Sequence, residues 1–321
     1  MTPETEPESQ PRAKSAAVSG ETARLVAVLA LNVALVLAVV VLVSRGGGSF
    51  PDLNARTLGL GCLPVSAALG LMLACRRLDF SLPVILALGL ALQTPRHLFT
   101  SQPILSMAIV CGAAAVLGLT SALVTWFGRI SSALWTGILG FGLLLVLRLL
   151  RIESAGPGLW PWPWAMAAAV GLLAAGAAVL GTTGLVTPPS TPPIIRSGSR
   201  GFAGLTAAWI IASVGVALAS LSNAAELSAQ RLLDSYPMML AAAALGGAFI
   251  LRGRWGALAA VLLTAVGHLA WSFAEHADMG NATANVLVPG LAPLVAIPLY
   301  LLIDRLIRRH TKESAPTGLL A

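Results

Sequence analysis

Runs of about 20 apolar residues recur along the whole chain, and this feature constrains the fold more than any other. One such run, as a helix, is long enough to cross the ~30 Å hydrocarbon core of a membrane. Of the 321 residues, 57% are hydrophobic and only 10% are charged, whereas soluble domains carry roughly 25% charged residues. Because a lipid-facing span must satisfy its own backbone hydrogen bonds, we expect an all-α polytopic membrane protein.

Hydropathy along the chain predicts ten candidate spans, and two of them are short. The predicted spans are 25–43, 57–75, 81–93, 104–127, 132–150, 164–186, 202–222, 237–251, 255–273 and 284–303. Segments 81–93 and 237–251 contain 13 and 15 residues, which is typical of broken or re-entrant helices. We therefore expect about ten transmembrane helices, within a range of eight to eleven.

The two ends of the chain differ from the apolar part in composition. Residues 1–22 are rich in Pro, Glu, Ser and Ala, and such a segment is predicted to be a disordered cytoplasmic tail. Residues 23–310 form the predicted membrane domain, and 311–321 a second cytoplasmic tail. The apolar run Leu25–Val43 is followed by SRGGGSF without a small-residue cleavage site, so it is predicted to be an uncleaved first span.

The distribution of arginine and lysine predicts the orientation in the membrane. With the N-terminus placed in the cytoplasm, 14 of these residues fall on the cytoplasmic side and 6 on the outside. Cytoplasmic loops carry an excess of positive charge, so both termini are predicted to be cytoplasmic. The net charge of +7 then reflects helix ends at the membrane and does not indicate nucleic-acid binding.

The segment RRLDFSLPVILALG, Arg76–Gly89, places three charged residues between apolar runs. Charged groups in such a position are costly unless they face water, a partner or a pathway. One interpretation is structural: Arg76 and Arg77 mark the cytoplasmic end of the second span, and Asp79 pairs with them. The other interpretation is that this turn contacts a partner protein.

The order of motifs around this turn resembles the permease subunits of bacterial ABC importers of the ribose/galactose/xylose type. In that family a helix with Ala-Leu-Gly leads into a Gly-Ile-Asp-Leu-Ser-Val-Gly turn and a second helix. Here AALGLMLAC (Ala67–Cys75) precedes the turn, and Asp79 and Ser81 match the family's Asp and Ser. The resemblance continues through Ala113–Leu150 and through LLIDRLIRRH, Leu301–His310.

The segment Ser228–Leu263 carries the closest similarity to the family. Its pattern there is Leu-Asp-Ala-Ile-Ala-Ala-Val-Val-Leu-Gly-Gly, a short loop ending in Gly-Arg-Gly, and a glycine-rich helix. The matching residues are Asp234, Leu245, Gly246, Gly247, Arg252, Gly253 and Gly256. In total the resemblance covers most of 45–310.

The resemblance implies a permease subunit that moves a sugar or similar small polar solute across a bacterial plasma membrane. Its implied partners are an ABC ATP-binding subunit, a second permease subunit in a homo- or heterodimer, an extracytoplasmic solute-binding protein and the lipid bilayer. ATP would be bound by the partner, so no cofactor is expected in this chain. The implied ATPase-coupling residues are Arg76, Arg77, Asp79, Ser81, Ile194, Ile195, Arg196, Arg200, Arg252 and Arg254.

Two departures from the family pattern keep an alternative open. Arg76 and Arg77 replace the two glycines before the Asp, and Leu82-Pro83 replaces the Val-Gly after the Ser. The family's coupling loop corresponds here to Thr187–Gly201, where four prolines exclude a regular helix. The alternative is a stand-alone carrier of the ten-helix drug/metabolite type, which would also have short loops and small-residue helices.

Polar residues within the spans are sparse, which singles out the candidates for a solute pathway. A desolvated sugar hydroxyl must regain its hydrogen bonds from hydroxyl, amide or aromatic groups. The candidates are Asn32, Gln93, Thr264, His268, Trp271 and Ser272. The alternative is that they form interhelical hydrogen bonds, worth about 0.6 kcal/mol each, with His268 a neutral packed histidine.

No motif in the sequence predicts catalysis or metal binding. The chain contains no GxSxG, HExxH or P-loop pattern, so we expect it not to be an enzyme. Cys62, Cys75 and Cys111 show no metal-ligand spacing and are interpreted as small buried residues. The tryptophans of GLWPWPWAM, around Trp162, are interpreted as an interfacial aromatic belt.

Overall fold

The computed structural model describes residues 10–54, 58–92, 103–149, 161–185, 199–221, 236–251 and 254–311, and within these ranges every regular element is an α-helix. The helices are α1 (Gln10–Gly46), α2 (Leu63–Ala74), α3 (Leu82–Leu92), α5 (Pro103–Phe127), α6 (Ser132–Leu149), α7 (Trp162–Thr182), α8 (Ser199–Ser220), α10 (Tyr236–Leu245), α11 (Gly256–His276) and α12 (Ala282–Thr311). This confirms the all-α prediction.

Each predicted span overlaps one of these helices, but the helices differ in length. Six of them are long and apolar enough to cross a membrane: α1, α5, α7, α8, α11 and α12. The predicted short segments 81–93 and 237–251 are indeed short helices, α3 with 11 residues and α10 with 10. The second segment is shorter than expected, because α2 begins only at Leu63 and has 12 residues. At the N-terminal end, α1 begins at Gln10, so part of the tail predicted to be disordered is helical.

The short helices α2, α3 and α10 form the centre of the molecule. Leu71, Met72, Leu86 and Met239 on these helices are fully buried. A helix that is apolar on all sides, as α2 and α3 are, is stable only when neighbouring helices surround it. Here α2 packs against α11, α8 and α7, while α3 packs against α8 and α6.

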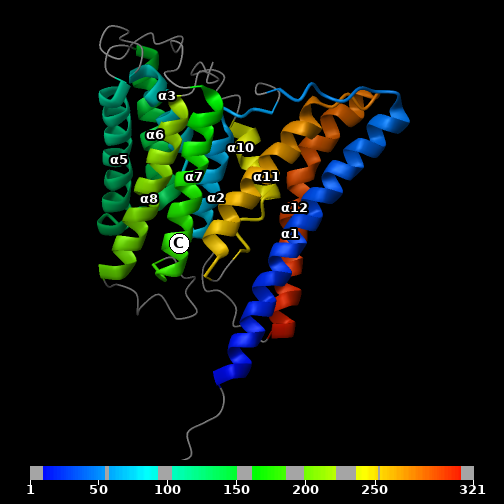
Figure 1. Cartoon of the computed structure of the whole chain (residues 1–321), viewed down its shortest axis with the longest axis horizontal. Helices are drawn as coiled ribbons and strands as arrows, with labels where there is room; N and C mark the ends of the chain where they lie inside the picture. Colours follow the sequence, from blue (N-terminus) through cyan, green and yellow to red (C-terminus); the bar gives the residue numbers. More distant parts are fainter. Residues whose placement is uncertain are drawn as a thin grey trace, which may run out of the picture.

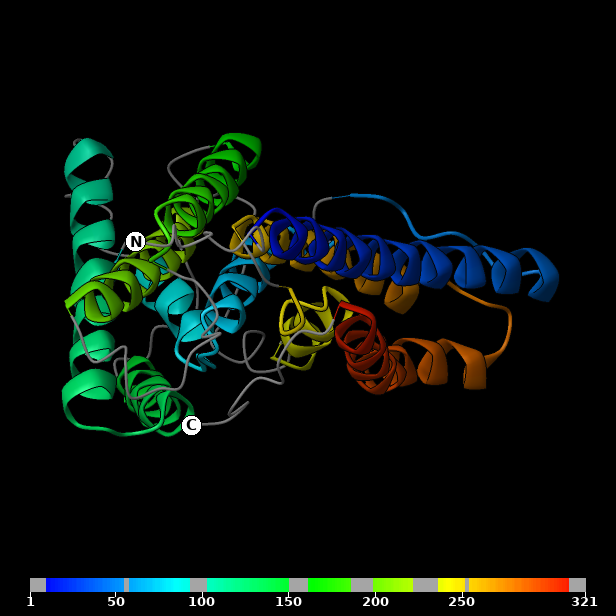
Figure 2. The ribbon, with the colours of Figure 1, turned by 90° about the horizontal axis from the view of Figure 1, so that it is seen from below.

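The long helices surround this centre and expose apolar side chains to the outside. In Figures 1 and 2, α5 and α6 lie at one end of the molecule, and α1 and α12 pack together at the other. Leu37 on α1, Phe141 on α6 and Leu294 on α12 are 57%, 71% and 63% exposed. Such extensive apolar exposure is typical of a surface that contacts lipid.

One end of the helix array is rich in arginine, and we call it the arginine-rich face. Contacts define it: Arg24 in the N-terminal half of α1 bonds Asp304 near the end of α12, and Glu21 accepts a hydrogen bond from the Trp255 amide before α11. The described arginines of this face are Arg24, Arg76, Arg77, Arg129, Arg254, Arg305, Arg308 and Arg309. The structure thus brings the N-terminal part of α1 and the C-terminal part of α12 to the same face.

The opposite face joins the loop after α1 to the loop between α11 and α12. Ser49 and Asp278 exchange two backbone hydrogen bonds of 3.0 Å each. The Asp278 side chain, in turn, accepts hydrogen bonds from the Gly280 amide and the Asn285 side chain. These bonds lower the pKa of Asp278, the bond from Asn285 most of all. The loop is therefore an ordered cap on this end of α12.

Candidate functional site

The turn Arg76–Ser81 interrupts two buried helices on the arginine-rich face. Helix α2 ends because Arg76 adopts a left-handed backbone conformation, with φ of 58°. The Arg77 amide then bonds the Met72 carbonyl at 2.9 Å, and the Arg76 amide bonds the Leu73 carbonyl at 2.9 Å. This pair of bonds is a Schellman motif, in which glycine is the favoured left-handed residue. The turn thus forms with arginine in the left-handed position.

Asp79 organises the return of the chain into α3. Its Oδ1 atom accepts hydrogen bonds from the Ser81 amide at 2.7 Å and from the Ser81 hydroxyl at 2.6 Å. The residue is only 1% exposed, and a carboxylate at this position complements the N-terminal dipole of the helix. The sequence-based pairing of Asp79 with Arg76 and Arg77 is therefore wrong, because Ser81 provides the partner.

Two hydroxyl groups of α6 hold the same turn from the other side. Thr136 Oγ1 accepts a hydrogen bond from the Phe80 amide at 2.9 Å, and Ser132 Oγ accepts one from the Leu78 amide at 3.3 Å. Both hydroxyl residues are buried. Neither residue was predicted, although their spacing of four residues places both on one face of α6. The turn is thus fixed to α3 through Asp79 and to α6 through these hydroxyls.

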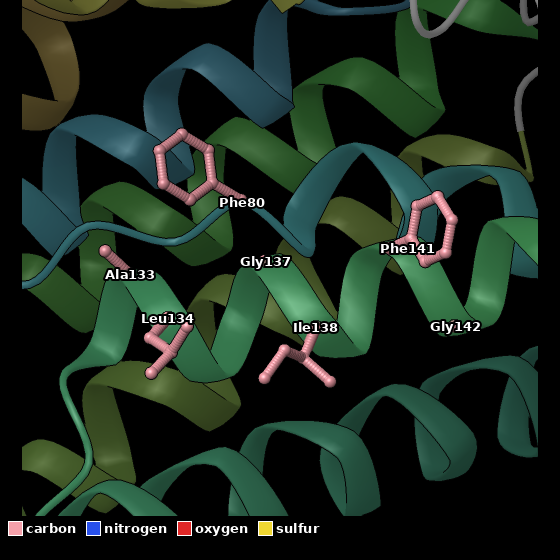
Figure 3. A pocket seen from close by; sticks show the side chains of 7 residues that line it. All are labelled: Phe80, Ala133, Leu134, Gly137, Ile138, Phe141 and Gly142. Atoms are coloured by element: carbon pink, nitrogen blue, oxygen red, sulfur yellow. The ribbon is translucent and has the colours of Figure 1, made fainter.

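An apolar groove lies along α6 beside Phe80. It has a volume of about 500 Å³ and is lined by Phe80, Ala133, Leu134, Gly137, Ile138, Phe141 and Gly142 (Figure 3). The glycines of α6 open this side of the helix, because a Cβ atom at Gly137 or Gly142 would meet nothing within 4 Å. The groove offers no hydrogen-bonding side chain, so it does not suit a sugar.

We expect the stability of the protein to fall between about pH 4 and pH 6 because of Asp79. Burial raises the pKa of Asp79 from 3.8 to about 6, against the opposing effect of the bonds from Ser81. An acid that holds its proton more tightly in the folded state contributes stability at low pH, and this contribution is lost as the pH rises through the folded pKa. The loss amounts to about 3 kcal/mol.

The difference between wild type and Asp79→Asn isolates this effect, because every other titrating group is shared. Asparagine keeps an oxygen that can accept the bonds from Ser81 but carries no charge. Thermal unfolding in detergent is to be followed from pH 4 to pH 8. The wild type should lose stability relative to the variant up to about pH 6, and the difference should then level off. A difference that does not change with pH would show that ionised Asp79 carries no penalty.

The other coupling candidates are only partly described. Arg254 lies on the arginine-rich face, with its guanidinium 5.6 Å from the Trp255 ring centroid, a distance typical of a cation–π contact. Arg200 lies in the first turn of α8. Ile194, Ile195, Arg196 and Arg252 lie outside the described residues. Arg76 and Arg77 follow the end of α2 and Arg254 precedes α11, and their role in coupling stays a prediction.

The pathway candidate His268 is fully buried and bonded through both ring nitrogens. Its Nε2 atom lies 3.0 Å from the Gly59 carbonyl oxygen and 3.2 Å from that of Leu58. Since carbonyl oxygens only accept, Nε2 carries the proton. The Ser66 hydroxyl therefore donates to Nδ1, at 2.9 Å. His268 is thus a neutral histidine that joins α11 to α2 and to the turn before α2.

The remaining candidates on α11 also take part in helix packing. Trp271 donates through Nε1 to the Pro289 carbonyl at 3.0 Å, which has no helical partner because Pro293 lacks an amide hydrogen. Thr264 is fully buried at the point where Gly70 of α2 and Gly246 approach α11. The Ser272 hydroxyl is buried near the Met238 sulfur.

Asn32 holds the end of the interrupted helix α10. Its Nδ2 atom donates to the Leu245 carbonyl at 2.9 Å, and the Tyr300 hydroxyl donates to the same oxygen at 2.7 Å. Helix α10 ends there because Gly247 adopts a φ of 55°. The last carbonyls of α10 are therefore left without helical partners. Tyr300 was not predicted. Gln93 lies outside the described residues.

The described residues form a helical membrane protein in which the helical path is interrupted after α2 and after α10. Side chains of neighbouring helices bond the backbone groups that lack helical partners at these two interruptions. Comparisons with family models, with curated proteins and with solved structures gave no match. Any assignment of function therefore depends on these residues and their geometry.

Proposed function

We propose that this chain is the membrane-spanning permease subunit of an ABC-type importer for a sugar or similar small polar solute. The observation that carries the proposal is the Arg76–Ser81 turn. It joins two short buried helices, lies on the arginine-rich face, and is bonded to both α3 and α6. A turn with these properties can receive a movement from a partner and pass it into the centre of the helix array.

The proposed mechanism follows from the bonds of the turn. Two ATP-binding subunits approach one another when they bind ATP, and the turn that contacts them is displaced. Because Asp79 is bonded at the start of α3 and Thr136 holds the Phe80 amide, α3 and α6 move with the turn. A packed core shifts between discrete arrangements rather than deforming continuously, so this movement favours one of two conformations with access from opposite sides.

The packing of α11 supports a subunit rather than a stand-alone carrier. His268, Thr264 and Ser272 are each at most 1% exposed, and His268 is bonded through both ring nitrogens. A histidine bonded in this way is not available to a solute. In the proposed assembly the solute therefore passes between two permease subunits, homo- or heterodimeric, after delivery by an extracytoplasmic binding protein.

The arginine-rich face is placed in the cytoplasm in this proposal. Positive residues concentrate on the cytoplasmic side of membrane proteins, and this is also where an ATP-binding subunit would lie. The opposite face, with Glu275 and Asp278, would then meet the binding protein outside a bacterial plasma membrane. Both termini of the chain would be cytoplasmic.

Charge reversal at the turn tests the proposed coupling. The variant Arg77→Glu places a negative charge where the ATPase subunit would dock. A docking surface that complements arginine is itself negative, and like-charge contacts at an interface are strongly unfavourable. We expect recovery of the ATPase with the tagged chain from its source membranes to fall about tenfold, equivalent to about 1.4 kcal/mol. The matched control is Arg45→Glu, at the other end of α1, which should leave recovery unchanged.

Two outcomes would contradict the proposal. The first is that the wild-type chain, extracted in mild detergent, never brings an ATPase subunit with it. The second is that the purified chain alone equilibrates a sugar across reconstituted vesicles, which would favour the carrier alternative.

A further inference from the structure

One face of α8 carries three buried polar atoms that have no hydrogen-bond partner among the described residues. They are Oγ1 of Thr206, Nε1 of Trp209 and Oγ of Ser213, and Trp209 and Ser213 are 0% exposed. The spacing of three and four residues places the three side chains on the same side of the helix. A hydroxyl in a helix can bond a carbonyl of its own helix, as that of Thr125 does. Buried polar groups that make no bond are costly and need a physical explanation.

This face of α8 lies against α5. A Cβ atom at Gly118 of α5 would lie 2.8 Å from the Trp209 carbonyl oxygen and 3.0 Å from Ser213 Oγ, so the helices meet there because Gly118 has no side chain. At the start of α8, the Phe202 ring lies 5.4 Å from the Phe127 ring of α5. We call this contact, from Phe202 to Ser213 on α8, the α5–α8 seam.

Helix α5 is connected through α6 to the Arg76–Ser81 turn. The loop between α5 and α6 has four residues, 128–131, and Trp135 of α6 donates through Nε1 to the Ser121 hydroxyl of α5 at 3.2 Å. Two hydroxyls of α6 bond the turn. Within the described residues α5 packs mainly against α8, at the edge of the molecule (Figures 1 and 2). A displacement of the turn can therefore pass through α6 to α5.

We propose that α5 moves away from α8 during transport and that Thr206, Trp209 and Ser213 then bind hydroxyl groups of the solute. This site depends on the proposed role in transport and names the contacts that the chain would make with the solute. Separating apolar helices in a membrane loses little hydrophobic energy, because lipid replaces the neighbouring helix. The three polar atoms gain the hydrogen bonds that they lack in the closed seam. In the proposed dimer, α8 would border the passage between the two subunits once α5 has moved.

The composition of the seam favours an uncharged solute. Helix α5 contains no charged residue, and Arg200 in the first turn is the one charged residue of α8. The indole N–H of Trp209 only donates, whereas the hydroxyls of Thr206 and Ser213 both donate and accept. A solute hydroxyl can accept from the indole, and further hydroxyls of the same molecule can bond the other two side chains. This is the chemistry of a sugar or another polyol.

The test is thiol labelling of Ser213→Cys in the full-length chain, in permeabilised membranes of its source organism, with and without ATP. A water-soluble methanethiosulfonate reagent reacts with the thiolate, which forms where water reaches the side chain. The mass of the labelled peptide separates this site from the native cysteines. We expect labelling to be faster with ATP, because the seam then opens.

Ala208→Cys is the matched control on the same helix. Ala208 is also 0% exposed, and it lies three residues before Ile211, which faces α7 at Gly176. This variant should stay unlabelled with and without ATP. Equal labelling of the two variants would show general loosening of the helices and would overturn the proposed opening of the seam.

The solute is tested by protection from labelling. The probes are D-ribose, D-galactose and D-xylose, added singly, and at least one should slow the labelling of Ser213→Cys. Adding Trp209→Phe keeps a ring but removes the N–H, so protection should need about fivefold more sugar, equivalent to about 1 kcal/mol for one hydrogen bond. Failure of all three sugars to protect would contradict the solute contacts.

The ATP arm separates failure of this site from failure of the permease proposal. No labelling of Ser213→Cys under either condition would overturn the opening of the seam, while recovery of an ATPase with the chain would still support the permease subunit. Labelling and sugar protection that do not depend on ATP would support the site on α8 and contradict transport driven by ATP.

Discussion

Replacing Asp304 with alanine should destabilise the protein by about 3–5 kcal/mol, the effect typical of breaking a buried ion pair by removal of one partner. Asp304 accepts hydrogen bonds from both Arg24 and Arg308, and it is nearly fully buried. Without the carboxylate, the guanidinium of Arg24 stays buried without the group that it shares with Arg308. The pair also joins α1 to α12, so the contact between these two helices should loosen first.

The measurement is thermal or denaturant unfolding in detergent, combined with the rate of cross-linking between cysteines placed on α1 and α12. Glu275→Ala is the control. Glu275 lies at the C-terminal end of α11, and its side chain is 43% exposed with a 3.9 Å contact to His276. Exposed ion pairs contribute about 0–1 kcal/mol. A loss for Asp304→Ala as small as that for Glu275→Ala would mean that water, rather than the carboxylate, solvates Arg24.

Gly246→Ala is expected to cost about 1–3 kcal/mol or more, the range for overpacking of a well-packed core. A Cβ atom at Gly246 would lie 2.5 Å from the Thr264 Cα atom and 2.7 Å from its backbone nitrogen. These are backbone atoms of α11, so no side-chain rotation can relieve the clash. Since α10, α11 and α2 meet at this point, the added methyl group must separate helices in the centre of the molecule.

Gly112→Ala is the control for Gly246→Ala, because a Cβ atom at Gly112 in α5 meets nothing within 4 Å. Alanine is favoured over glycine within a helix by about 0.5–1 kcal/mol, so this variant should be slightly stabilised. Opposite signs for the two variants in the same unfolding experiment would support the close approach of α10 and α11. A neutral Gly246→Ala would show that the helices lie further apart than in the structure.

Much of the helix pattern was predictable from hydropathy. The positions of the ten helices in the described parts of the chain follow the apolar runs, because each run must be helical to satisfy its backbone in lipid. The short lengths of α3 and α10 were also visible in the sequence. The early end of α10 was not predicted, because Gly246 and Gly247 were treated as part of a continuous apolar run.

The candidate residues were predicted by type more successfully than by role. Asn32, His268 and Trp271 were recognised as polar groups in apolar surroundings, which is a local property. Their partners are the carbonyl groups of Leu245, Gly59 and Pro289. A carbonyl lacks a helical partner in a turn, at a helix end or four residues before a proline, and only the packing shows which side chain reaches it.

The sequence by itself determined that the chain forms apolar helices and that its arginines cluster at helix ends, since both properties depend only on the residues within each segment. The tertiary structure alone decided that Asp79 bonds Ser81 rather than the arginines, that Ser132 and Thr136 hold the turn, and that Arg24 meets Asp304, 280 residues away. Hydrogen bonds and ion pairs depend on distances of a few ångströms between side chains. Those distances are set only when the helices pack.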